Sequence, residues 1–128
     1  MRAGGRCVRD RGAATSLSVA LLTPVFVVLA FAAVQAALWS HARTEARVIA
    51  RDAAALVARS GAAPADARGS AAAVLRSDTD LRDVHVRVDA GGDLVTVVVT
   101  GRAPGIITGT TAPVAVTEVI PREERVAP

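Results

Sequence analysis

The sequence is poor in several of the residues that usually stabilise a small protein. Among its 128 residues there is no lysine, no tyrosine and only one cysteine, Cys7, so an internal disulfide is excluded. The only aromatic residues are Phe26, Phe31 and Trp39, and none follows residue 39. Because aromatic side chains supply much of the buried area of small cores, residues 40–128 must build a core from Val, Ile, Leu and Ala.

Charge is absent from residues 13–39, which contain no Asp, Glu, Lys or Arg over 27 positions. A helix needs about 20 apolar residues to cross a bilayer core. Large apolar residues recur here on every side, which leaves no polar face for water, and the rest of the chain is too small to enclose such a helix. The stretch predicts a transmembrane helix over residues 13–39, kinked rather than broken at Pro24, and we expect Pro24 to belong to a helix interface.

Positive charge is in excess only in the first twelve residues. Four arginines and one aspartate give residues 1–12 a net charge of +3, and the 11 arginines and 11 acids that follow cancel. A short basic arm before an apolar span orients a membrane protein more often than it binds nucleic acid. Four more arginines lie between residues 43 and 59, but the arm is denser, and long C-terminal parts translocate largely regardless of charge. We therefore expect a single-pass protein of the cell membrane with a cytoplasmic N-terminus and an extracytoplasmic C-terminal domain.

Residues 40–60 keep a helical period outside the span. Five apolar residues recur at spacings of four and three, which is typical of one face of a helix: Ala42, Ala46, Ile49, Ala53 and Leu56. Continued backwards, this seam meets Trp39 and Gln35, so one helix can run unbroken from the bilayer into an Ala-rich juxtamembrane segment. Its small side chains suit close packing against a neighbouring helix or against this chain's own sheet. We expect Ala42, Ala46, Ile49 and Ala53 to form a helix interface.

A second face of the same segment carries three arginines, at positions 43, 47 and 51. Like charges four residues apart on a helix repel one another mildly. This stripe is either a solvated face near lipid headgroups or a docking stripe for an acidic partner or anionic lipid.

Residues 61–128 predict a small α+β domain. Ser60-Gly61 and Pro64 end the long helix, and Ala67, Ala71, Val74 and Leu75 share one face of a shorter helix over residues 66–76. The period then changes to two. Strands are expected over residues 84–89, 94–100 and 114–120, with a hairpin turn at Gly91-Gly92-Asp93, a loop over residues 101–111, and Pro113 and Pro121 at the ends of the third strand.

Catalytic and metal-binding patterns are not apparent in the sequence. His41 and His85 are the only histidines, and neither has a neighbouring nucleophile or acid in a recognisable motif. Asp78, Asp80 and Asp83 lack the glycine and the distal glutamate of a calcium loop, and they read as a solvated cluster that caps a helix. We expect no enzymatic activity, no cofactor, no metal and no small-molecule substrate.

Several stretches together resemble one family. A basic arm ends in Asp10-Arg11-Gly12, small residues follow, and an apolar span has a proline twelve residues after that glycine. The likeness continues in further stretches of the chain: residues 34–43, the Ala-rich helix, residues 95–100, Pro104-Gly105 and residues 123–128. This pattern is similar to TadE-like proteins, the minor pilin-like components of bacterial tight-adherence (Flp-type IV) pilus systems.

The resemblance implies a structural role in pilus assembly or secretion at the bacterial surface, with other membrane subunits or pilins as partners and the lipid bilayer as surroundings. It also implies processing between Gly12 and Ala13. Pilin-type N-termini carry a glutamate soon after that glycine, whereas no acid occurs here between Asp10 and Glu45. A second interpretation is a secretory signal cleaved between Ala36 and Ala37, which would release a small secreted binding module.

Overall fold

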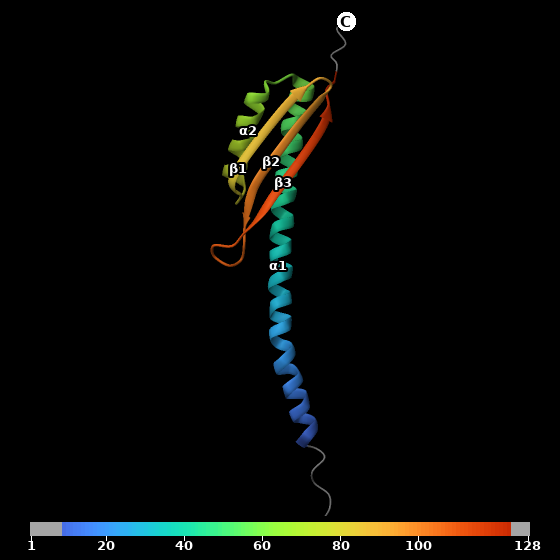
Figure 1. The fold of residues 1–128 in the computed structure, drawn as a ribbon, viewed down its shortest axis with the longest axis vertical. Helices are drawn as coiled ribbons and strands as arrows, with labels where there is room; N and C mark the ends of the chain where they lie inside the picture. Colours follow the sequence, from blue (N-terminus) through green and yellow to red (C-terminus); the bar gives the residue numbers. More distant parts are fainter. Residues whose placement is uncertain (1–8, 124–128) are drawn as a thin grey trace, which may run out of the picture. The chain divides into compact units, whose positions relative to one another are not determined.

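The computed structural model describes residues 9–123, with side chains from residue 15 onward, and it confirms the α+β class (Figure 1). The chain forms two compact units, Met1–Val34 and Gln35–Pro128. Its elements, in chain order, are α1 (Arg9–Ser60), α2 (Pro64–Asp78), β1 (Arg82–Gly91), β2 (Leu94–Pro104) and β3 (Thr111–Pro121).

The first element, α1, is a single helix of 52 residues. It begins at Arg9, so residues 9–12, which we had assigned to a separate arm, are helical. Arginine and alanine are good helix formers, and a single glycine is tolerated among them. The helix ends at Ser60 as predicted, because Gly61 adopts a φ of +66° and its N–H donates to Val57 O at 3.2 Å. A left-handed glycine of this kind satisfies a carbonyl of the last turn and stops the helix.

Within the first unit, α1 continues through Pro24 without interruption, so the proline does not break the helix. Proline has no N–H, and the carbonyl of Ala20, four residues earlier, therefore lacks its helical donor. Two hydroxyl groups of this unit find acceptors inside the helix. Ser16 Oγ donates to Gly12 O at 2.9 Å, and Thr23 Oγ1 donates to Val19 O at 2.7 Å. Such back-bonding lets polar side chains sit in an apolar environment.

The second unit contains an antiparallel sheet in the order β1-β2-β3. The predicted hairpin is confirmed: Gly91 pairs with Leu94, and the turn between them contains Gly92 at a φ of +59°. The loop between β2 and β3 is shorter than predicted, because the ladder continues until Pro104 pairs with Thr111. Pro113 consequently lies inside β3 rather than at its end. Proline has no N–H to donate, and an edge strand such as β3 tolerates this because one of its sides has no neighbouring strand.

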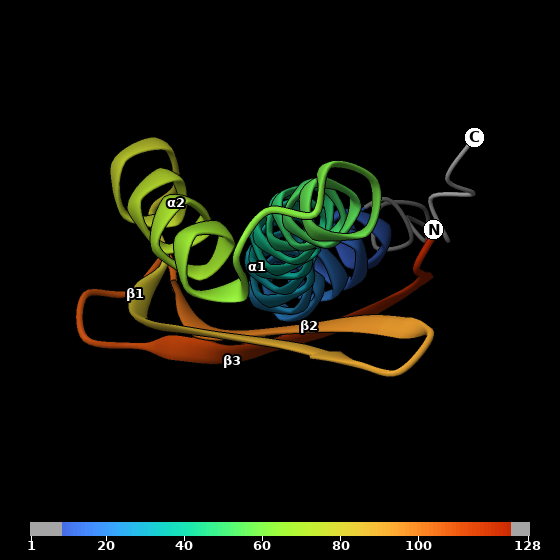
Figure 2. The same cartoon turned by 90° about the horizontal axis from the view of Figure 1, so that it is seen from above.

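The core of this unit lies between the sheet and two helices. Figure 2 shows α2 and the C-terminal part of α1 on the same face of the sheet. The period-two valines that predicted β2 are all on that face, since Val95, Val97 and Val99 are fully buried. Because no aromatic residue contributes, the core consists of small and medium aliphatic side chains. Its other buried members are Ala46, Ala50, Ala53, Ala54, Val57, Ala58, Ala67, Ala71, Leu75, Leu81, Val84, Ala103, Val114 and Val116.

The helix α2 begins two residues earlier and ends two residues later than predicted. Pro64 occupies its first turn, where the missing N–H costs nothing. Of the residues expected on its apolar face, Ala67, Ala71 and Leu75 are buried, whereas Val74 remains 39% exposed. At the C-terminal end the Thr79 hydroxyl donates to Leu75 O and so satisfies one of the last carbonyls.

Candidate functional site

The apolar half of α1 has no protein packed against it among the described residues. An 18-residue window in this helix has a mean hydropathy of 2.5, and none of that window is buried. By length and composition the helix can cross a membrane, which fits the predicted span. Burying one such large side chain is favourable by about 1.5–3 kcal/mol, so leaving the surface in water would be costly. The exposed large residues are Leu17, Val19, Leu21, Leu22, Val25, Phe26, Val27, Val28, Leu29, Phe31 and Val34.

At the start of the second unit, two α1 side chains hydrogen-bond to distant parts of the chain, one to the β2–β3 loop and one to β3. The backbone N–H of Ile106 donates to Gln35 Oε1 at 2.9 Å. One turn later, Trp39 Nε1 donates to Pro113 O at 3.0 Å. The guanidinium of Arg43 lies 5.5 Å from the centre of the Trp39 ring, within the range of a cation–π contact. We call these five residues, Gln35, Trp39, Arg43, Ile106 and Pro113, the junction cluster.

The sequence predicted Trp39 as the last residue of the apolar span and did not predict the junction cluster. Its two hydrogen bonds join residues 71 and 74 positions apart, and no local pattern in the sequence signals such pairs. The one feature of the sequence that sets this region apart is an absence of charge. Residues 103–117 contain no charged side chain, although Arg102 and Glu118 flank them.

The arginine stripe is partly used within the chain. Arg43 lies over Trp39, and Arg47 Nε is 3.4 Å from Glu118 Oε1 on β3. Farther along the helix, Arg59 Nε lies 3.9 Å from Glu123 Oε1. The arginines of both pairs are exposed. Ion pairs at a protein surface contribute about 0–1 kcal/mol, so they orient the side chains more than they stabilise the fold.

The predicted seam lies at one margin of the buried face of α1. Ala46 and Ala53 are buried in the chain's own core, while Ala42 and Ile49 are partly buried against it. The sequence had left two packing partners open for the seam, a neighbouring helix and the chain's own sheet. These residues pack in the core that the chain forms with its own sheet. Leu56 remains 47% exposed. A shallow apolar hollow of about 280 Å³ between the two helices exposes the outer edge of the seam, and it is lined by Ile49, Asp52, Ala53, Leu56, Ala67, Ser70, Ala71 and Val74.

The proposed processing positions both fall within α1. Gly12 is helical, with open space where a Cβ would be, and the side chain of Ala13 lies outside the described residues. Ala36 and Ala37 are exposed, but their backbone is helical too. Cleavage between them would remove Gln35 and with it the hydrogen bond to Ile106.

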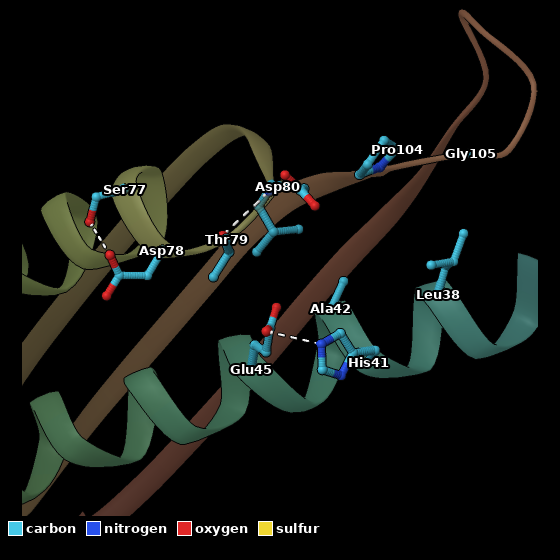
Figure 3. A pocket seen from close by; sticks show the side chains of 11 residues that line it. Leu38, His41, Ala42, Glu45, Ser77, Asp78, Thr79, Asp80, Pro104 and Gly105 are labelled. Atoms are coloured by element: carbon cyan, nitrogen blue, oxygen red, sulfur yellow. Dashed lines mark hydrogen bonds and ion pairs between the residues drawn. The ribbon is translucent and has the colours of Figure 1, made fainter.

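A polar hollow of about 360 Å³ lies between α1, the end of α2 and the end of β2 (Figure 3). His41 Nε2 lies 3.1 Å from Glu45 Oε1, and Ser77 Oγ donates to Asp78 Oδ1 at 2.6 Å. The serine is thus paired with its own neighbour and not with the histidine, so these groups do not form a nucleophile–base pair. Within residues 9–123, no three His, Cys, Asp or Glu side chains are grouped so that they could hold a metal ion.

Comparison with known proteins supports the predicted resemblance. Residues 13–55 match the family model described as TadE-like protein. The match covers the apolar span and most of the Ala-rich helix. No curated protein and no solved structure matches the chain.

Proposed function

We propose that this chain is a membrane-anchored, minor pilin-like component of a bacterial Tad/Flp-type pilus or secretion apparatus. Its role is structural: the apolar half of α1 holds it in the cell membrane, and residues 35–128 form a small domain on the extracytoplasmic side. The family match over residues 13–55 supports the pilus context.

One observation carries the proposal, namely the exposure of the apolar half of α1. Its large side chains are 47–67% exposed between residues 17 and 34, and no charge interrupts them. Lipid tails or neighbouring transmembrane helices are the surroundings that suit such a surface. Small residues in the first half of the span let other helices approach closely, as is common within membranes: Ala13, Ala14, Ser16 and Ala20.

Cys7 allows a direct test of membrane topology, because it is the only thiol in the chain. Cells are treated with a maleimide that does not cross the cytoplasmic membrane. Cys7 should react only after permeabilisation, whereas Asp93→Cys in a Cys7→Ser background should react in intact cells. The reverse pattern would overturn the orientation.

The pilus role is tested in native cells that lack the chain. We expect surface pili to be lost, to return with the native protein, and not to return with Val28→Arg, which places a charge in the span. Normal piliation without the chain would overturn the pilus role and leave the anchor standing.

Release as a secreted module is the alternative outcome, and intact mass separates the two. A membrane-bound chain, at full length or beginning at Ala13, supports the anchor. A soluble chain that begins near Ala37 would favour a secreted binding module instead.

A further inference from the structure

The β2–β3 loop, residues 105–110, exposes two adjacent isoleucines. Ile107 is 69% exposed, and no large apolar side chain among the described residues is more exposed. Ile106 is 37% exposed. Transfer of both side chains from water into an apolar environment would be favourable, and the domain core does not enclose them.

Hydrogen bonds hold this loop in one conformation. The Gly105 N–H donates to Thr110 O at 2.8 Å, and the Thr110 N–H and hydroxyl both donate to Ile107 O, at 3.0 and 2.7 Å. Only glycine fits at position 105, because a Cβ there would lie 2.0 Å from Thr110 Oγ1. The exposure of Ile107 is therefore built into a closed turn.

The loop lies at the end of the domain where the chain arrives from the apolar stretch. Gln35 is the first residue of the second unit and is bonded to Val34, the last residue of the first. Its side chain accepts the Ile106 N–H at 2.9 Å. Ile106 is therefore tied by a hydrogen bond to the residue that directly follows the apolar stretch in the chain.

The surroundings of the loop also suit a lipid interface. The fifteen residues 103–117 carry no charge, so inserting the loop would not bury an ion. The indole of Trp39 lies on the adjoining turn of α1, and the Arg43 guanidinium lies over its ring. Tryptophan favours the headgroup boundary of a bilayer, and a nearby arginine can reach phosphates there.

We propose that Ile106 and Ile107 insert into the interfacial layer of the bilayer and give the domain a second membrane contact beside α1. This rests on the proposed function, because it needs the apolar stretch to span the membrane. The partner is the boundary between headgroups and acyl chains, and the loop fixes which end of the domain faces it.

Fluorescence of the full-length chain in vesicles tests this contact. In a Cys7→Ser background, an environment-sensitive fluorophore is attached at Ile107→Cys, and the vesicles contain phosphatidylcholine, phosphatidylglycerol and a lipid spin-labelled on its acyl chain. The matched control is Asp93→Cys in the β1–β2 turn, at the opposite end of β2 and about 30 Å away. We expect blue-shifted emission and about threefold stronger quenching at position 107, as for a residue within ~5–10 Å of the headgroup boundary.

Vesicle flotation separates this proposal from the anchor. If the chain floats with vesicles but position 107 is quenched no more than position 93, the loop contact is wrong and the anchor stands. Blue-shifted emission without lipid quenching would mean that a protein covers the loop, which also overturns the contact. If the chain does not float, both proposals fail.

Discussion

The two halves of α1 use apolar residues in opposite ways. Between residues 17 and 34 the large side chains of Leu, Val and Phe are exposed all around the helix. Between residues 46 and 58 the buried side chains are five alanines and Val57, while the larger Val48 and Leu56 remain 53% and 47% exposed. One continuous helix thus shows its largest residues in one half and buries its smallest in the other.

The difference shows that the size of an apolar side chain, more than its hydrophobicity, reports what a helix packs against. In the second unit the buried face of α1 consists mainly of alanine, and a close-packed core leaves little space there for larger side chains. A helix surrounded by lipid meets a fluid that adapts to any shape, and large side chains add apolar area there without clashes. Four pairs of substitutions test this contrast.

The largest effect is expected at Leu75, one of the fully buried side chains of the second unit. Leu75→Ala removes packed volume from a core that has no aromatic residue to fill the gap, and it should lower the free energy of unfolding by about 2–5 kcal/mol. Urea unfolding followed by far-UV circular dichroism in lipid nanodiscs measures the loss. Val74→Ala, at a side chain 39% exposed, is the control and should cost far less. Membrane fractionation of both variants should be unchanged, since the apolar half of α1 is untouched.

The next effect concerns the exposed half of α1. Val28→Arg places a charge near the centre of the span, and arginine at such a position opposes insertion by about 2.5–3.5 kcal/mol. We expect less of the chain in membranes by carbonate extraction, with Val28→Leu fractionating like the native protein. Equal extraction of the two variants would mean that this surface does not lie in lipid.

Matched alanine-to-leucine changes compare the two halves directly. Ala50 is fully buried between α1 and the sheet, so Ala50→Leu overpacks the core and should destabilise the domain by about 1–3 kcal/mol. Ala30→Leu adds the same atoms to an exposed position in the span and should leave stability and membrane insertion unchanged. Urea unfolding of both variants measures the contrast. If the two substitutions had the same effect, side-chain size would not distinguish the two halves.

The same packing changes how the seam should be tested. Ala46 is fully buried, so Ala46→Leu would disturb the domain whether or not another chain binds there. Leu56 and Val74 lie at the open edge of the seam, and polar substitutions at these positions test a partner contact with less damage to the core.

Local patterns predicted most of the fold. The alternation of valines in β1 and β2, the hairpin glycines and the stop at Gly61 each depend on neighbouring residues, and each is confirmed. The limits of β2 and β3 were missed because they depend on pairing, since Pro104 is held in the ladder by its partner Thr111.

The buried face of α1 and the junction cluster depend on tertiary structure. The periodicity of large apolar residues assigned Ile49 and Leu56 to the buried face of the helix. In the structure the fully buried residues next to them are Ala50 and Ala54. The hydrogen bonds of Gln35 and Trp39 join residues 71 and 74 positions apart, so a pattern within a short window of sequence does not reveal them. The apolar span was predictable because a helix that crosses a lipid bilayer needs only an apolar composition and sufficient length, and both can be read from the sequence.

The smallest expected effect concerns the indole at the boundary between the two halves. Trp39→Phe keeps an aromatic ring but removes the N–H that donates to Pro113 O, and the edge strand then loses one tie to α1. A hydrogen bond of this kind contributes about 0.5–1.5 kcal/mol, and urea unfolding by circular dichroism should show a loss in that range. Arg43→Gln removes the cation from the ring and keeps the indole bond, so its cost should be smaller than that of Trp39→Phe. If Trp39→Phe unfolded at the native urea concentration, Trp39 would serve the membrane boundary alone and the domain would not depend on it.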